Sequence, residues 1–260
     1  MKCIRFLRSE DAVSEVVDFS IILGIMLLAV AVIGVAGFPL VEHMQESGHA
    51  ENVRQSFIVL TANINKIVFG AAPSQSVELK LYGGLVSVTG DSAINVTVQV
   101  WNESSSSVES STFERHMRMI QNEFEDRFIC YENTGAWAQY PIGDALMVSR
   151  PKFVLHDDVL TIPAVMISGS TGISGVGLVR VTSDGGTASV YSYYNVSQVD
   201  ITIKSKYYKA WERYLKDTDD LGMQSISVDD TNTTVHLRKD DFTDNIDVHV
   251  IYSPMSVTID

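Results

Sequence analysis

Residues that could take part in catalysis are scattered along the chain and form no known motif. No H-E-x-x-H, C-x-x-C, G-x-S-x-G, Walker or G-x-G-x-x-G pattern stands where its chemistry would need it. His43 and His49 are six residues apart, which does not place them on one helical face. The run His156-Asp157-Asp158 would need a distant serine to form a triad. We therefore expect a protein that is not an enzyme, with no catalytic residues, metal or cofactor.

Two loops have compositions that suit ligands. "DTDDLG", residues 217–222, offers oxygen atoms and a glycine turn, but it lacks the twelve-residue loop and final glutamate of an EF-hand. "SGSTGISGVG", residues 168–177, is rich in glycine, yet no helix follows it to receive a phosphate at its amino terminus. We interpret the first as an acidic turn after a helix and the second as a hairpin loop.

Four Asn-X-Ser/Thr sequons are candidates for glycosylation. They begin at Asn95, Asn102, Asn195 and Asn232. Asn95 falls on the polar face of an expected strand and the other three lie in or beside expected turns, so a glycan at each would leave the core intact. We expect at least one to be occupied if this part of the chain is extracellular.

Charge and cysteine content exclude two classes of protein. The formal net charge is −13, and an anionic surface repels phosphate backbones, so nucleic-acid binding is not expected. Cys3 and Cys130 lie on opposite sides of a long apolar run, which argues against a disulfide scaffold. We expect Cys130 to be a small buried residue in a strand.

The apolar run, residues 19–41, carries no charge. At about 1.5 Å per residue it is long enough to cross a hydrocarbon core of about 30 Å. Three basic residues precede it and Glu42 and Glu46 follow it, so the positive-inside rule predicts a cytoplasmic amino terminus and an extracellular body. A signal-peptidase site at Ala29-Val30-Ala31 would fall inside the run, which argues against an ordinary signal peptide.

Helical periodicity continues beyond this run. Apolar residues recur every three or four positions at Val53, Phe57, Leu60, Ile64 and Ile67, as on one face of an amphipathic helix. "GAAP", residues 70–73, would end that helix. We therefore predict one helix over residues 13–72, apolar in its first half and amphipathic in its second half.

From residue 73 to 260 the pattern changes to the alternation typical of strands. Residues 77–81 and 85–88 alternate around Gly83-Gly84, which predicts a hairpin, and residues 102–112 are a polar loop or linker. In "SKYYKAWERYLKD", residues 205–217, aromatic residues recur at helical spacing. Such a stripe either packs on a sheet or binds sugar or a partner, and we favour packing. The predicted fold is α+β: a long helix, then an antiparallel, sandwich-like β domain with one packed helix.

The amino-terminal arrangement resembles archaeal type IV pilin-like proteins. "AVSEVV", at the start of "AVSEVVDFSIILGIMLLAV", is similar to the "VSPVIG"-type start of many such pilins. The segments "FICYENTGAW", "VSRPKFVL" and "KYYKAWERYL" resemble archaeal surface proteins that carry the same helix. The resemblance implies a prepilin peptidase that cuts between Ala12 and Val13, so residues 1–12 would be a leader.

The sequence departs from the pattern of bacterial pilins at one position. Bacterial pilins carry a glutamate at the fifth mature position, which here would be Val17. Glu15 and Asp18, three residues apart on one helical face, are the available substitutes for pairing with the amino terminus of a neighbouring subunit. Alternatively, these carboxylates mark only the inner edge of the membrane.

The resulting hypothesis is a pilin-like, single-pass protein of the cell envelope that can assemble into a type IV pilus-like filament as a minor subunit. Its partners would be the lipid bilayer, other pilin-like subunits through the amino-terminal helix, and a prepilin peptidase. The alternative is a monomeric, membrane-tethered extracellular binding module. An extracellular hydrolase is less well supported, because no motif identifies a nucleophile or metal site.

Overall fold

The computed structural model describes residues 10–102, 106–169, 172–217 and 221–260. The chain divides into two compact units, residues 1–50 and 51–260. The described part confirms the predicted α+β class, because a long apolar helix precedes a large sheet and one further short helix.

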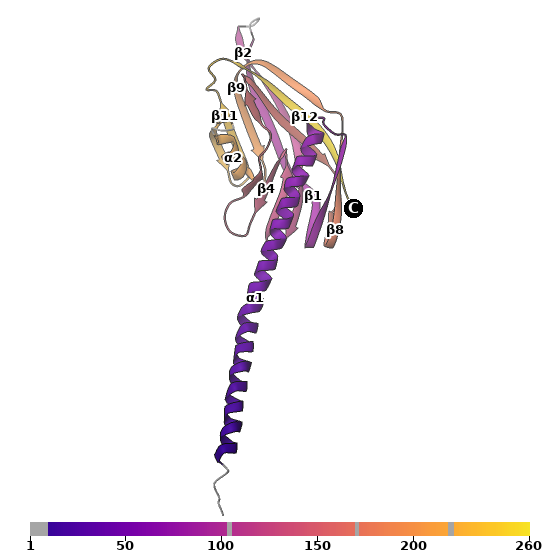
Figure 1. Cartoon of the computed structure of the whole chain (residues 1–260). Helices are drawn as coiled ribbons and strands as arrows, with labels where there is room; N and C mark the ends of the chain where they lie inside the picture. Colours follow the sequence, from indigo (N-terminus) through magenta and orange to yellow (C-terminus); the bar gives the residue numbers. More distant parts are fainter. Residues whose placement is uncertain (1–9, 103–105, 170–171, 218–220) are drawn as a thin grey trace, which may run out of the picture. The chain divides into compact units, whose positions relative to one another are not determined.

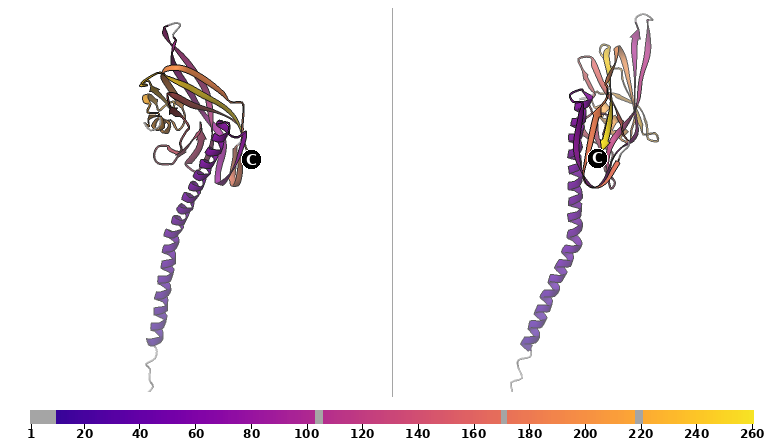
Figure 2. Two further views of the ribbon diagram at one scale, coloured as in Figure 1. Left: turned by 45° about the horizontal axis from the view of Figure 1, so that its top comes forward. Right: turned by 90° about the vertical axis from the view of Figure 1, so that its right-hand side faces the viewer.

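Helix α1 (Glu10–Val68) belongs to the first unit up to residue 50 and to the second unit from residue 51. Within the second unit, Phe57, Leu60 and Ile64 are at most 1% exposed, so the predicted apolar face is confirmed. Figure 2 shows residues 51–68 running along the strands they cover. The helix ends where Gly70 adopts φ +73° and its N–H donates to Ile67 O, a common way to terminate a helix.

The β domain contains a twelve-stranded sheet (Figure 1). Its order is β10-β11-β9-β12-β8-β1-β2-β3-β4-β5, with β7 paired to β12 and β6 paired to β7. The described pairings are antiparallel except for β7 with β12, which is parallel. The strands are β1 (Ser74–Asn102), β2 (Ser107–Phe124), β3 (Arg127–Glu132), β4 (Gly135–Gln139), β5 (Leu146–Ser149), β6 (Val154–His156), β7 (Val159–Ser168), β8 (Gly172–Gly185), β9 (Ser189–Lys204), β10 (Gln224–Asp229), β11 (Thr234–Lys239) and β12 (Ile246–Ile259).

Strand β1 organises the sheet because it changes partner along its length. Its first part pairs with β8 as far as Ser87, and from Ala93 it pairs with β9. Strand β2 runs along its other edge from Leu85. The two parts of β1 contribute to two separate apolar clusters, one beneath residues 57–68 of α1 and one beneath the second helix.

The hairpin predicted at Gly83-Gly84 is wrong. The segments on either side both belong to β1 and pair in succession with β8, with a shift of register between Tyr82 and Leu85. Gly83 has φ +109°, and a Cβ on Gly84 would collide with the Glu123 carbonyl. The two glycines therefore permit a bulge and a close approach of strands rather than a tight turn.

The loop predicted over residues 102–112 is also largely wrong. Asn102 ends β1, and Ser107 begins β2, whose first residues pair directly with β1. Residues 103–105 lie outside the described part of the chain. This polar, largely exposed segment forms a strand because β1 provides partners for its backbone N–H and C=O groups, and this pairing does not require apolar side chains.

Helix α2 (Tyr208–Lys216) confirms the packing interpretation of the aromatic stripe. It lies beside β11 (Figure 1), and Trp211 and Leu215 are fully buried. The Trp211 ring is 4.7 Å from that of Trp137 and 5.7 Å from that of Phe153, measured between ring centroids. This side of α2 is therefore core and presents no platform to a ligand.

Candidate functional site

The first candidate site is the apolar surface of α1 before residue 50. Large apolar side chains from Val16 to Met44 are exposed, from 45% at Leu23 to 79% at Val35. Within the described residues, α1 is the one helix long and apolar enough to span a membrane. An apolar surface of this extent is typical of a helix that is covered by lipid or by other apolar helices.

The predicted cleavage and pairing residues lie at the start of this helix. Ala12 and Val13 fall within α1, which begins at Glu10. The side chains of residues 1–15, and so the Glu15 carboxylate, lie outside the described part, whereas Asp18 is exposed on α1. Leader cleavage and pairing with a new amino terminus remain predictions.

The first sequon lies inside the sheet. Asn95 is half-buried in β1 between Glu114 of β2 and Thr202 of β9. Its Oδ1 accepts a hydrogen bond from Thr97 Oγ1 at 3.2 Å. This carboxamide is on the polar side of its strand, as predicted.

The other three sequons are nearer to chain reversals or irregularities. Asn102 ends β1, and Asn232 lies in the turn between β10 and β11, where its Nδ2 donates to Asp229 Oδ2 at 2.6 Å. Asn195 is not in a turn but inside β9, with φ +57° and Nδ2 3.4 Å from the Trp101 carbonyl oxygen. Whether any sequon carries a glycan remains a prediction.

Residues considered for metal or acid–base chemistry do not converge in the described part of the chain. No three His, Cys, Asp or Glu side chains there are placed to hold a metal ion. Asp217 follows α2, and residues 218–220 of the acidic segment lie outside the described part. His156 contacts its neighbour Asp157 at 3.1 Å, and both side chains are exposed. Cys130 is fully buried in β3, as predicted.

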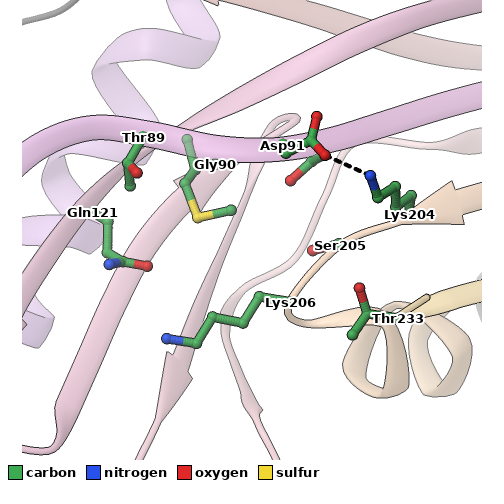
Figure 3. A pocket seen from close by; sticks show the side chains of 10 residues that line it. Thr89, Gly90, Asp91, Gln121, Lys204, Ser205, Lys206 and Thr233 are labelled. Atoms are coloured by element: carbon green, nitrogen blue, oxygen red, sulfur yellow. Dashed lines mark hydrogen bonds and ion pairs between the residues drawn. The ribbon is translucent and has the colours of Figure 1, made fainter. Parts of the chain in front are cut away.

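The second candidate site, which we call the bulge cavity, lies where β1 changes partner (Figure 3). It has a volume of about 410 Å³ and is lined by residues 89–92 of β1, Met119 and Gln121 of β2, residues 204–206 at the end of β9, and Thr233. The β1 register shifts between Thr89 and Ser92, and Gly90 has φ +97°. The bulge therefore opens the sheet at this point.

A buried carboxyl group holds the wall of the bulge cavity together. Glu132 is fully buried, and its oxygens accept hydrogen bonds from Ser92 Oγ, from Ser205 Oγ at 2.8 Å and from Trp211 Nε1 at 2.8 Å. Burial raises the pKa of the Glu132 carboxyl, although the three hydrogen bonds oppose this. Glu132 thus joins the bulge of β1, the end of β9 and helix α2.

Two lysines of the bulge cavity have different environments. Lys204 Nζ is 2.5 Å from Asp91 Oδ2. Lys206 instead lies over the Phe128 ring, with Nζ 3.2 Å from its centroid. Burial lowers the pKa of Lys206, an effect that Cys130 and Glu123 oppose. In Figure 3, Lys206 and Gln121 extend on one side of the cavity and the Asp91–Lys204 pair lies on the other.

Sequence reasoning did not identify this cavity. Glu132 is the last residue of β3 and belongs to "FICYENTGAW", where nothing in the local sequence distinguishes its carboxylate from an exposed one. Its partners are 40, 73 and 79 residues away in the chain. The pairing of distant strands and the packing of α2 bring them together.

Comparison with known proteins relates the whole chain to a family. A sequence model of a family of unknown function, DUF7289, matches residues 12–258. An uncharacterized protein of Archaeoglobus fulgidus is 33% identical over 79 residues. That similarity covers 30% of this chain and 26% of the relative, so it spans about a quarter of the relative's length. It indicates an archaeal-like protein, and neither comparison brings an activity with it.

Proposed function

The chain belongs to the DUF7289 family, and we propose that it is a pilin-like envelope protein, anchored by α1 and assembled as a minor subunit of a type IV pilus-like filament. The observation that carries this proposal is the exposed apolar surface of α1 from Val16 to Met44. The family match begins at residue 12 and includes the helix together with the β domain, which favours a retained segment over a discarded signal.

The proposed mechanism uses one helix surface in two environments. In the membrane, lipid covers the apolar side chains; in a filament, equivalent helices replace the lipid. Small residues, such as Gly24, Gly34 and Ala36 of α1, permit close approach between helices. A body of this size suits a minor subunit better than the bulk subunit of a filament.

Processing and topology complete the proposal. A prepilin peptidase removes residues 1–12, and the carboxylates of Glu15 and Asp18 pair with the amino group of Val13 in a neighbouring subunit. Basic residues before α1 keep its start in the cytoplasm, and the β domain lies outside. There, one or more of Asn95, Asn102, Asn195 and Asn232 carries a glycan.

Amino-terminal sequencing of the protein recovered from native membranes and from shed filaments tests this proposal. We expect the mature chain to begin at Val13. An intact Met1 in both fractions would contradict prepilin processing.

Cysteine cross-linking tests assembly directly. Removal of the leader also removes Cys3, and Cys130 is buried, so an introduced cysteine reports its own contacts. When the Ala36→Cys variant is oxidised in native membranes, it should form disulfide-linked dimers if the α1 helices of two subunits pack together. Val59→Cys, on an exposed position of α1 in the β-domain unit, is the control expected to give fewer.

A second candidate function is a monomeric, membrane-tethered binding module. The bulge cavity favours it, because about 410 Å³ is within the range of ligand sites in proteins. An uncleaved amino terminus, no cross-linking at Ala36→Cys and ligand binding would together favour this candidate.

A further inference from the structure

The bulge cavity presents hydrogen-bond donors that the described part of the chain leaves unused. Gln121 Oε1 accepts from the Tyr207 hydroxyl at 3.2 Å, but its Nε2 has no partner among the described residues. Lys206 Nζ contacts aromatic rings and no carboxylate in the same part of the chain. The hydroxyl groups of Thr89 and Thr233 likewise make no hydrogen bond there.

The acceptors around these donors are already engaged. Both Glu132 oxygens receive hydrogen bonds from the protein, and the Asp91 carboxylate is held by Lys204. A polar cavity with spare donors and one cation without a carboxylate partner suits a ligand with acceptor oxygens and negative charge. Long-range attraction does not explain such binding, because the chain carries a net charge of −13.

The volume of the cavity, and the polar residues opposite Lys206 and Gln121, indicate which class of ligand it could hold. About 410 Å³ is more than a carboxylate alone would fill. Across from Lys206 and Gln121, the Asp91–Lys204 pair and Thr233 provide both acceptors and donors (Figure 3). Such mixed polarity suits sugar hydroxyl groups, which donate and accept together.

We propose that the bulge cavity binds a carboxylate-bearing sugar. Its carboxylate lies at Lys206 Nζ and Gln121 Nε2, and its ring hydroxyls face Asp91 and Thr233. Stacking on Phe128 holds the Lys206 ammonium in place before the ligand arrives, which reduces the entropy lost on binding. This site goes beyond the proposed filament role and does not depend on whether a filament forms.

Calorimetric titration of the full chain in lipid nanodiscs tests this proposal, with D-glucuronate, D-glucose and inorganic phosphate as probes. We expect D-glucuronate to bind at least about tenfold more tightly than D-glucose, since charged hydrogen bonds contribute most. Lys206→Met keeps the aliphatic stem but removes the charge, so it should weaken D-glucuronate about tenfold or more. It should leave D-glucose unchanged.

Lys80→Met is the matched control. Lys80 is also exposed and lies over a tyrosine ring, with Nζ 5.2 Å from the Tyr82 centroid, but it does not line the cavity. This variant should bind D-glucuronate as the wild type does. Equal affinity in Lys206→Met and wild type, or the same loss in Lys80→Met, would overturn the proposal.

A second variant and the wild-type titrations provide further tests of the site. Gln121→Glu retains an acceptor for the Tyr207 hydroxyl but replaces the free amide donor by a charged oxygen, so it should also weaken D-glucuronate. It decides the question if Lys206→Met fails to fold. Absence of D-glucuronate binding in the wild type, or phosphate binding as tightly as D-glucuronate, would show that no acidic-sugar site exists.

Discussion

Replacement of Glu132 tests how strongly its buried carboxyl joins three parts of the β domain. Glu132→Leu removes the acceptor of all three hydrogen bonds. The Ser92 and Ser205 hydroxyls can rotate toward other groups, but the Trp211 indole N–H is fixed by its buried ring. One unsatisfied buried donor costs about 1–3 kcal/mol and each weakened hydroxyl bond about 0.5–1 kcal/mol. We therefore expect the free energy of unfolding to fall by about 3 kcal/mol.

Glu132→Gln removes the titratable carboxyl group but can keep its hydrogen bonds, so it separates the two effects on stability. The amide oxygen can accept from Ser205 and Trp211, as a Glu132 oxygen does. The amide NH₂ can donate to the Ser92 hydroxyl, which then rotates to accept. This variant should lose less than about 1 kcal/mol.

Comparison of the wild type with Glu132→Gln should also reveal a pH dependence of stability. Burial raises the pKa of Glu132 above its ordinary 4.5, so the folded state binds this proton more tightly than the unfolded state does. Its stabilising contribution is complete below the unfolded pKa and is lost as pH rises through the folded pKa. Relative to Glu132→Gln, the wild type should therefore lose stability as pH rises from about 4.5. Asp200, whose pKa is lowered because Arg238 and Gln198 outweigh burial, is present in both proteins and cancels.

Urea unfolding followed by tryptophan fluorescence at several pH values measures both effects. Glu123→Gln, at an exposed position on β2, is the control and should change stability by less than about 0.5 kcal/mol. The reasoning is refuted if Glu132→Leu is as stable as the wild type. It is also refuted if the wild type gains stability over Glu132→Gln as pH rises.

Three further predictions concern other parts of the chain. Leu60→Ala should cost about 2–5 kcal/mol in unfolding experiments because Leu60 is 1% exposed, whereas Val59→Ala, at 52% exposure, should cost much less. Gly169→Ala should melt lower than Gly143→Ala: both glycines have positive φ, but only the Cβ at Gly169 would lie 2.6 Å from a backbone carbonyl oxygen, that of Val257. Mass spectrometry of peptides from the native protein should find a glycan on at least one of the four sequon asparagines, and four unmodified asparagines would remove this support for an extracellular β domain.

The features that sequence predicted correctly depend on local periodicity. The apolar face at Phe57, Leu60 and Ile64 repeats every three or four residues, and its burial follows from that spacing alone. The aromatic spacing around Trp211 likewise predicted the packed side of α2.

The features that sequence missed depend on distant partners. Gly83-Gly84 has the composition of a hairpin, but β8, about a hundred residues away, pairs with both sides of it and keeps β1 in one strand. The parallel pairing of β7 with β12 and the transfer of β1 from β8 to β9 are set in the same way. The bulge cavity lies at that transfer, so no local pattern could have predicted it.

Strand β3 links the part of α1 that belongs to the β-domain unit to the bulge cavity through neighbouring residues. Successive side chains of a strand point to opposite faces, and Tyr131 lies in the cluster beneath α1 while Cys130 lies in the cluster beneath α2. The Tyr131 hydroxyl donates to Asn65 Oδ1 of α1 at 3.3 Å, and the next residue, Glu132, joins the cavity wall to Trp211. The end of α1 and the proposed ligand site are therefore attached to adjacent positions of one short strand, whose last four residues are buried.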